Sequence, residues 1–417
     1  MSPTTDESTM SETIVVTGIG AVTPVGIGKQ ATWEALLAGR SGISEVESFD
    51  TAAYNVHRGG EVHGFAPQTH LETLDPASLG RASQLAAAAA RLALADAGVD
   101  PVTVEAARAG VAMGTTSGEP QEVERFDDCM VAERLGDVDE RFIALYPCHA
   151  IAGNVAAEVG FAGPNAMIPT ACAAGNYAVA HACDLLRAGR AELMLAGGAD
   201  CFSRITYTGF ARLGAIAPER CQPFDRERQG MIPGEGAAVL VLEPLSRARA
   251  RGARIYAEVA GYGLTCDAHH MTGAHPEGDG AARAMRMALR ESRLEAADVD
   301  YVSAHGTGTP TNDKLETIAV HRVFGDGARR VPVSSIKSML GHTMGAASAI
   351  EAAVCALAVA EGVVPPTINH ETADPECDLD VVPNEAREID VRVAMNNAYA
   401  FGGNNASVIF RRLGAAA

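Results

Sequence analysis

The stretch Ile168-Pro169-Thr170-Ala171-Cys172-Ala173-Ala174-Gly175-Asn176 decides the fold of this chain, because a strand turns into a helix around a single cysteine. A glycine-proline turn at 163–165 precedes a short apolar strand over 166–169, and an apolar-periodic helix follows over 177–186. Cys172 is therefore predicted at or near the first helical turn, where unpaired backbone amides favour a thiolate. A free cysteine ionises near pH ~8.5, and such a position can lower its pKa by about one unit or more.

The cysteine stretch has two interpretations when it is taken alone. A buried structural cysteine is the usual fate of a free thiol, whereas the small neighbours of Cys172 leave room for a substrate to reach the sulfur. Two later segments favour catalysis: His305 ends an apolar strand within 302–310, and His342, within 334–347, precedes a small-residue helix predicted over 345–360. One cysteine and two histidines at strand-to-helix junctions predict a nucleophile with two imidazole partners.

These motifs and their order resemble the β-ketoacyl-[acyl carrier protein] synthases of the elongating, Cys-His-His kind, over residues 14–410. The resemblance implies an α/β thiolase-like fold, in which two similar halves stack in an αβαβα arrangement. We expect one half over residues 12–252, which carries the cysteine, and the other over 253–412, which carries both histidines. Residues 1–11 are polar and are predicted to be disordered.

Two glycine motifs are consistent with such a duplication. A buried strand over 13–18 is predicted to turn at Gly18-Ile19-Gly20, and a strand over 255–260 to end at Gly261-Tyr262-Gly263. The first motif could also be a dinucleotide-binding loop, but Thr23 stands where a third glycine is expected. A structural turn is therefore the favoured interpretation.

The resemblance also implies roles for the site residues. Cys172 would accept the acyl group, while His305 and His342 would stabilise the enolate formed from malonyl-carrier protein. Lys337 would orient the histidines, and the backbone amides of Cys172 and Phe401 would form an oxyanion hole. The side chain of Phe401 would be the gate between the nucleophile and the acyl tunnel.

Further positions carry supporting roles by the same resemblance. These are Thr307 and Thr309 as contacts of the pantetheine arm, Phe202 and Phe210 at the acyl tunnel, and Glu316 and Glu351 as supporting acids. Ordinary core packing is the alternative for the two phenylalanines. The closing motif of the family usually has glycine where Ala400 stands and threonine where Asn404 stands. Because alanine restricts the backbone more than glycine does, these departures favour a specialised type II polyketide synthase over housekeeping fatty-acid elongation.

Charge restricts the partners. A net charge of −19 argues against non-specific nucleic-acid binding. Acyl carrier proteins are themselves acidic, so docking would need a local basic patch. The candidates are arginine clusters at 247–254 and 322–330, with ordinary solvated arginines as the alternative. The expected partners are a carrier protein and a second subunit, identical or resembling a chain-length factor, and no cofactor is expected beyond the carrier's phosphopantetheine.

Cysteine usage and hydropathy favour a cytoplasmic location. Nine cysteines without paired spacing fit a reducing compartment, and charged residues interrupt the apolar helical stretches, so we expect no membrane span. The segment 266–275, with one cysteine and three histidines, fits no zinc spacing and is predicted to be a polar loop. No metal is expected.

Two alternatives remain. Thiolases and chain-initiating synthases combine the cysteine with one histidine and a second cysteine or an asparagine, so His342 argues against both. A non-catalytic partner subunit would lack the nucleophile, so Cys172 argues against that role.

Overall fold

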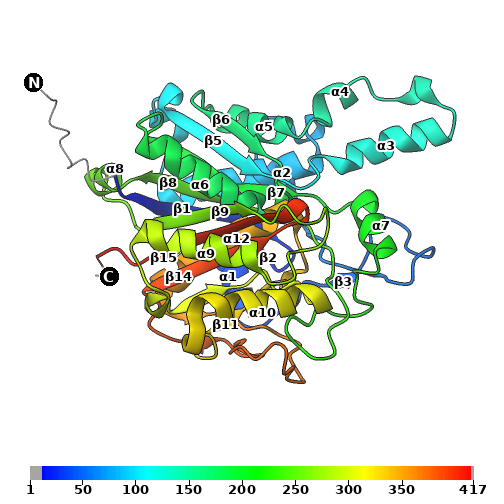
Figure 1. The fold of residues 1–417 in the computed structure, drawn as a ribbon. Helices are drawn as coiled ribbons and strands as arrows, with labels where there is room; N and C mark the ends of the chain where they lie inside the picture. The colour runs from blue at the N-terminus through cyan, green and yellow to red at the C-terminus, as the bar shows by residue number, and fades with distance from the viewer. Residues whose placement is uncertain (1–11, 415–417) are drawn as a thin grey trace, which may run out of the picture.

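The protein is described by a computed structural model that covers residues 12–414, and the predicted disorder of residues 1–11 lies outside the described residues. The main sheet has the strands β1 (Ile14–Thr23), β2 (Gly26–Ile27), β5 (Ala109–Gly114), β6 (Asn165–Ile168), β7 (Leu193–Asp200), β8 (Gly236–Pro244), β9 (Ala257–Cys266), β10 (Tyr301–Ser303), β11 (Val333–Ser334), β14 (Val393–Tyr399) and β15 (Asn404–Arg411). Two small hairpins pair β3 (Ser44–Glu45) with β4 (Arg58–Gly59) and β12 (Val363–Val364) with β13 (Arg387–Glu388). Figure 1 shows these elements.

The sheet consists of two halves with the same topology. Its order is β11-β10-β14-β15-β9-β1-β8-β7-β5-β6, with β2 attached to β1. When the strands of each half are numbered in chain order, leaving out β2, both halves give the order 3-2-4-5-1 from their outer edge. The halves join where β1 and β9 pair over only two residues, Val15 with Glu258 and Val16 with Ala257. The predicted pair of similar α/β halves is confirmed.

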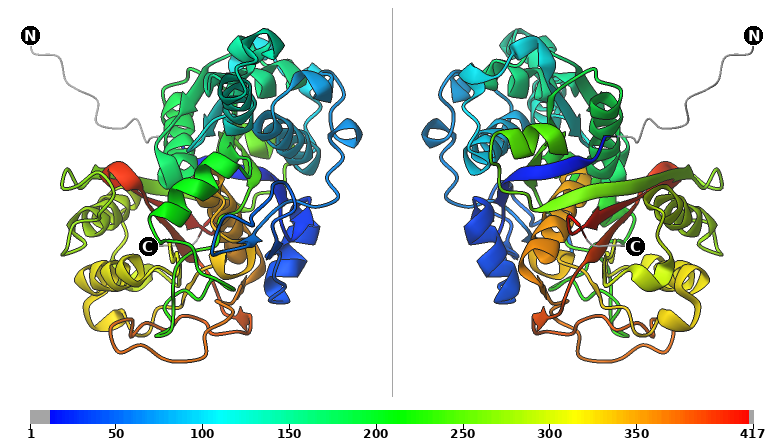
Figure 2. Two further views of the ribbon diagram at one scale, coloured as in Figure 1. Left: turned by 90° about the vertical axis from the view of Figure 1, so that its right-hand side faces the viewer. Right: turned by 90° about the vertical axis from the view of Figure 1, so that its left-hand side faces the viewer.

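Helices form three layers around the two half-sheets (Figures 1 and 2). The helices are α1 (Lys29–Leu37), α2 (Arg81–Ala97), α3 (Pro120–Val131), α4 (Phe142–Leu145), α5 (His149–Val159), α6 (Ala174–Arg187), α7 (Arg204–Arg212), α8 (Leu245–Ala250), α9 (Asp279–Ser292), α10 (Pro310–Phe324), α11 (Lys337–Leu340) and α12 (Ala347–Glu361). Helices α6 and α12 pack against each other and against strands of the main sheet, whereas α2 with α5 and α9 with α10 form the outer layers. This is the predicted αβαβα arrangement.

The two glycine motifs do not form turns, and that prediction is wrong. Strand β1 continues through Gly18 and Gly20, and β9 continues through Gly263. A Cβ atom on Gly20 would lie 2.0 Å from the Ala89 carbonyl of α2, and one on Gly263 would lie 2.0 Å from the Ala284 carbonyl of α9. Glycine is required there because an outer helix approaches the strand closely, and both halves use the same device.

Helix α12 is the central core helix. Residues 344–361 are long and apolar enough by composition to cross a membrane, with a mean hydropathy of 1.5. However, 89% of the segment 344–361 is buried inside the protein. Its apolar character is explained by contact with α6 and with strands of both halves.

Candidate active site

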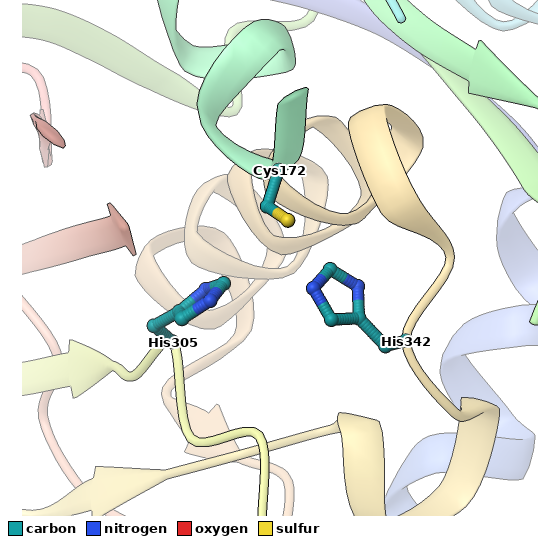
Figure 3. Close-up of side chains that lie close together, drawn as sticks. All are labelled: Cys172, His305 and His342. Atoms are coloured by element: carbon teal, nitrogen blue, oxygen red, sulfur yellow. The ribbon is translucent and has the colours of Figure 1, made fainter. Parts of the chain in front are cut away.

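Three side chains from separate segments converge in one place (Figure 3). Cys172 lies in a 3₁₀ turn, Ala171–Ala173, between β6 and α6, while His305 follows β10 and His342 precedes α12. Potential ligand atoms of the three side chains lie within 4.8 Å of one another. The two imidazole ring centroids are 5.5 Å apart, with an angle of 83° between the ring planes. The predicted association of one thiol with two imidazoles is therefore present.

The duplication explains how two of these residues meet. Cys172 follows the third strand of its half and precedes α6, and His342 occupies the corresponding junction between β11 and α12. Because α6 and α12 pack side by side in the central layer, their N-terminal ends bring the thiol and the imidazole together.

Backbone amides are available at the two predicted oxyanion-hole residues, Cys172 and Phe401. Within residues 12–414, neither the N–H of Cys172 nor that of Phe401 donates a hydrogen bond to another residue. Ala171, immediately before the cysteine, has a φ of +50°, which is an unfavourable conformation for a residue with a Cβ atom. This strained turn presents the thiol and its amide at the start of the helical segment.

The hydrogen bonding of His342 defines its tautomer. Its Nδ1 atom accepts the backbone N–H of Met344 at 3.1 Å, so the ring proton resides on Nε2. An Nε2–H group is a hydrogen-bond donor and has no lone pair for a metal ion. In the described part of the chain, Cys172, His305 and His342 are the side chains close enough together to hold a metal ion. The hydrogen bond from the Met344 N–H to His342 disfavours metal coordination by these three residues.

His305 is held through its backbone. Its N–H and that of Gly306 donate to the carboxylate of Glu316 at 2.8 and 2.7 Å. The Nζ atom of Lys337 donates to the His305 carbonyl at 2.6 Å and also pairs with Glu351. Lys337 is only 1% exposed. Glu316 and Lys337 therefore hold the main chain at His305, Glu351 pairs with Lys337, and Lys337 forms no hydrogen bond with either imidazole.

Replacing Lys337 with methionine is expected to lower the free energy of unfolding by about 3–5 kcal/mol, because Glu351 would remain buried and unpaired. Denaturant unfolding measures this loss. The double variant Lys337→Met, Glu351→Leu is the control, and it should recover part of the loss because no buried charge remains. A loss below about 1 kcal/mol in the single variant would contradict the buried ion pair.

The ionisation of the thiol differs from the sequence prediction. Burial raises the pKa of Cys172 to about 12, while the positive charge of Lys337 acts in the opposite direction. Burial, assisted by the charge of Lys337, holds the pKa values of His305 and His342 well below the usual histidine range. The prediction of a lowered thiol pKa is wrong, because the thiol is only 9% exposed and loses most of its hydration. At neutral pH the site contains a thiol and two neutral imidazoles.

The pH dependence of thiol alkylation follows from this ionisation. Because the raised pKa lies above the working range, the thiolate fraction of Cys172 should rise about tenfold per pH unit. The rate of iodoacetamide alkylation, followed by intact mass, should therefore climb continuously from pH 7 to pH 9. A plateau that is reached below pH 7 would indicate a lowered pKa instead.

The three residues line a cavity of about 280 Å³. Thr307 and Thr309 line it as well, and their hydroxyl groups lie 2.9 Å apart. The ring of Phe401 is 43% exposed at the cavity and its centroid lies 5.8 Å from that of Phe210, which also lines it. The structure thus places four further predicted residues in the same cavity as the cysteine.

Phe202 lies elsewhere. It is buried in an aromatic cluster, with ring centroids 5.7 Å from Phe49 and 5.8 Å from Tyr207, and it is not among the residues that line the cavity. The core-packing alternative describes its surroundings.

The departures in the closing motif cause no backbone strain. Ala400 has a φ of −136°, an extended conformation that any residue adopts, whereas Gly402 and Gly403 have φ values of +83° and +77°. The two glycines that require a left-handed backbone are therefore retained. Asn404, with a φ of −75°, begins β15 without a special conformation.

Two features of the site were not predicted from the sequence. The loop predicted to be merely polar contributes Asp267 and Thr272 to the cavity wall, and the Gly402 N–H donates to the Met271 carbonyl of that loop at 2.8 Å. Asp200, at the end of β7, is buried and accepts a hydrogen bond from the turn that follows His342. An aspartate at the end of a buried strand was the available signal for Asp200.

Fold and site define a thiolase-like enzyme in which one cysteine and two histidines lie together in a cavity. Family models agree: the N-terminal domain of β-ketoacyl synthases matches residues 11–248, and the C-terminal domain matches residues 256–371. The chain belongs to the β-ketoacyl synthase family. It is an elongating 3-oxoacyl-[acyl-carrier-protein] synthase, of the fatty-acid or the type II polyketide kind, and an acyltransferase. Its substrates are carried on the phosphopantetheine of a carrier protein, and the family uses no additional cofactor.

Named relatives cover nearly the whole chain. The 3-oxoacyl-[acyl-carrier-protein] synthase 2 of Staphylococcus aureus (strain COL) is 39% identical over 405 residues, which are 96% of this chain and 98% of the relative. The enzyme of the same name from Synechocystis sp. is also 39% identical, with the same coverage of 96% and 98%.

Solved structures share the fold. The ishigamide ketosynthase/chain length factor is similar with a TM-score of 0.93 and 42% identity, covering 97% of this chain and 100% of that one. A ketosynthase bound to a hexaketide, solved with its type II polyketide acyl-carrier protein, has a TM-score of 0.88 and 32% identity, with coverage of 97% and 100%.

Proposed function

We propose that the chain catalyses decarboxylative condensation of an acyl group on Cys172 with malonyl-carrier protein. The convergence of this thiol with two imidazoles in one cavity is the observation that supports it. In the first half-reaction the sulfur attacks the thioester of an acyl-carrier protein, and the carrier's thiol leaves with the proton of Cys172. The amides of Cys172 and Phe401, which donate to no other residue within 12–414, stabilise the oxyanion.

In the second half-reaction His305 and His342 bind the thioester oxygen of malonyl-carrier protein. Their low pKa values keep both rings neutral, and the Nε2–H of His342 is a hydrogen-bond donor without a positive charge. Loss of the carboxylate as carbon dioxide leaves an enolate, and this oxygen carries the negative charge. The α-carbon then attacks the acyl-Cys172 thioester, and the released thiolate regains a proton.

The supporting residues have positional roles in this proposal. Glu316 and Lys337 hold the main chain at His305, and Glu351 neutralises Lys337 in the buried interior. Thr307 and Thr309 supply hydroxyl groups at the cavity wall for the amides of the pantetheine arm. Phe401, beside the two left-handed glycines, is the gate to the acyl tunnel.

A type II polyketide pathway is the favoured context, located in the cytoplasm. Ala400 and Asn404 depart from the usual closing motif, and the chain is 42% identical to a ketosynthase/chain length factor. The test is product analysis with a panel of acyl-carrier proteins and malonyl-carrier protein. Repeated extension without reduction of the keto groups supports the polyketide pathway. A single extension that is restricted to saturated acyl groups supports fatty-acid elongation. No release of carbon dioxide with any acyl donor would contradict the condensation.

The carrier protein is proposed to dock at the cavity mouth beside Arg212. The two basic clusters predicted earlier are largely occupied, since Arg247 and Arg251 pair with the buried Glu243, and Arg329 pairs with Asp378. Arg212 is exposed at the end of α7 and has no ion pair within residues 12–414.

Position and charge make Arg212 suitable for an acidic partner. Its neighbours Phe210 and Leu213 line the cavity, and Leu213 is itself exposed. A free cation beside exposed apolar side chains at the cavity mouth fits a carrier protein whose surface is acidic.

The variant Arg212→Glu, which reverses the charge, is expected to raise KM for malonyl-carrier protein about tenfold with little change in kcat. A charge at the rim of an interface acts mainly on the rate at which the two proteins associate. Steady-state kinetics at low salt measure the effect. Arg330→Glu is the matched control, since Arg330 also has no ion pair among residues 12–414 and lies outside the cavity. Equal KM values for the two variants would contradict docking at Arg212.

The second subunit is proposed to pair along β6. This strand is the outer edge of its half-sheet. A strand such as β7 could not pair with a second subunit, because it lies between β5 and β8. Among residues 12–414 no strand pairs with the outer edge of β6, and an edge that leads directly into the nucleophile turn is suited to extending the sheet across a dimer axis. Either an identical chain or a chain-length-factor-like subunit would fit, and native mass spectrometry of the co-expressed proteins separates the two.

A further inference from the structure

One buried carboxylate near the site has no role in the steps described above. Asp200 accepts four hydrogen bonds: from the Thr115 hydroxyl at 2.9 Å and the Ser117 N–H at 2.9 Å, and from the Thr116 N–H at 2.7 Å and the Gly345 N–H at 2.6 Å. All four donors are neutral, and Asp200 forms no ion pair in the described part of the chain. Its carboxylate thus connects the ends of β5 and β7 with the turn that leads into α12.

A negative charge at this position is costly to bury without a cation. Burial raises the pKa of Asp200 to about 6, against the opposing effect of its four donors, so the carboxylate is mostly ionised at neutral pH. An uncharged amide has one acceptor oxygen and could not serve all four donors. The geometry therefore requires a carboxylate rather than any polar group of similar size.

The turn that receives this carboxylate contains His342. The His342 N–H donates to the Ile232 carbonyl at 2.6 Å, the Met344 N–H donates to the imidazole Nδ1, and the Gly345 N–H donates to Asp200. A Cβ atom on Gly345 would lie only 2.6 Å from the carboxylate oxygen, so glycine allows the close contact. These three hydrogen bonds hold the turn: the first and the last connect its two ends to the half that carries the cysteine, and the Asp200 bond is the one that involves a charged side chain.

We propose that Asp200 is a positioning residue for the condensation, which fixes the turn 342–346 and thereby the donor group of His342 relative to Cys172. The inference rests on the proposed function, because it assigns Asp200 a part in the same reaction. The charge also acts on the nucleophile: burial is the main cause of the raised pKa of the Cys172 thiol, Lys337 lowers this pKa, and Asp200 and Glu351 raise it further. Loss of the charge should therefore have opposite effects on condensation and on thiol reactivity.

The variant Asp200→Asn tests both effects. It should lower the rate of malonyl-carrier protein decarboxylation about ten- to a hundredfold, because small displacements of a donor have effects of that size. Alkylation of Cys172 by iodoacetamide at pH 7 should become about two- to tenfold faster, since a one-unit fall in pKa is tenfold in thiolate. In ¹⁵N spectra, the Nδ1 signal of His342 should shift because the Met344 hydrogen bond is disturbed.

Glu158→Gln is the matched control. Glu158 is a buried carboxylate in α5 that also holds a loop, through the N–H groups of Glu72 at 2.7 Å and Leu74 at 2.9 Å, and it does not line the cavity. This variant should lose stability without changing decarboxylation, alkylation or the His342 signal. If Asp200→Asn behaves like Glu158→Gln in all three measurements, Asp200 is a structural link only and the proposal is overturned.

Gly345→Ala separates position from charge and decides the question if Asp200→Asn fails to fold. The added methyl group displaces the turn from the carboxylate but leaves the charge in place, so decarboxylation should fall while alkylation stays unchanged. Wild-type decarboxylation in Gly345→Ala would overturn the proposal. If the unmodified protein releases no carbon dioxide, the proposed function fails, and the His342 signal still decides whether Asp200 positions the imidazole.

Discussion

Replacing Cys172 with alanine is expected to abolish acyl loading and to reduce condensation by about 10⁴-fold or more, because no other group can form the covalent intermediate. The substitution removes one sulfur atom next to a cavity, so the fold should be retained. Decarboxylation of malonyl-carrier protein should persist, since the two histidines and not the thiol bind the thioester oxygen in this mechanism. Radiolabelled acyl transfer and carbon dioxide release measure the two half-reactions separately.

Cys183→Ala is the matched control for this prediction. Cys183 lies in α6, eleven residues after Cys172, and burial raises its pKa to about 12 as well, but it does not line the cavity. Loading and condensation should stay near the unmodified level in this variant. Comparable loss in both variants would mean that the thiol of Cys172 has a packing role only.

Replacing His342 with alanine is expected to reduce malonyl decarboxylation about 10²- to 10³-fold, the usual effect of removing one oxyanion donor. Acyl loading of Cys172 should be better preserved, because the oxyanion of that step is bound by backbone amides. Stopped-flow decarboxylation and single-turnover loading separate the effects. An equal loss in both half-reactions would contradict the proposed division between the imidazoles and the amides.

His321→Ala is a suitable control for the loss of an imidazole. His321 lies in α10, and its Nε2 atom is 2.6 Å from a carboxylate oxygen of Asp378. It does not line the cavity. Its removal should affect neither half-reaction.

The sequence predicted the fold well because the signals for strands and helices are local. The strand-to-helix turn at Cys172, the helix that follows it and the small-residue helix after His342 are all present close to their predicted bounds. The motif at Gly18-Ile19-Gly20 was misinterpreted because glycine is favoured both in a turn and in a strand that a helix approaches closely. Only the position of α2, which is set by tertiary packing, distinguishes the two.

The site was predicted in part, because local motifs can be recognised in the sequence whereas contacts set by tertiary packing cannot. Cys172, His305 and His342 could be found because each stands in its own motif, and the structure places them together. The pKa of the thiol could not be predicted, since it depends on burial by the surrounding protein rather than on the helix terminus alone. Asp200 was missed because its partners Thr115 and Gly345 come from segments 85 and 145 residues away.

The central claim is that an acyl group resides on Cys172 and is consumed by malonyl-carrier protein, and intact-mass analysis of the acylated protein tests it most directly. After incubation with acyl-carrier protein, the account predicts one acyl adduct, located on the Cys172 peptide, that disappears on addition of malonyl-carrier protein as carbon dioxide is released. An adduct on another residue, or one that persists while the chain-extended product accumulates, would contradict it.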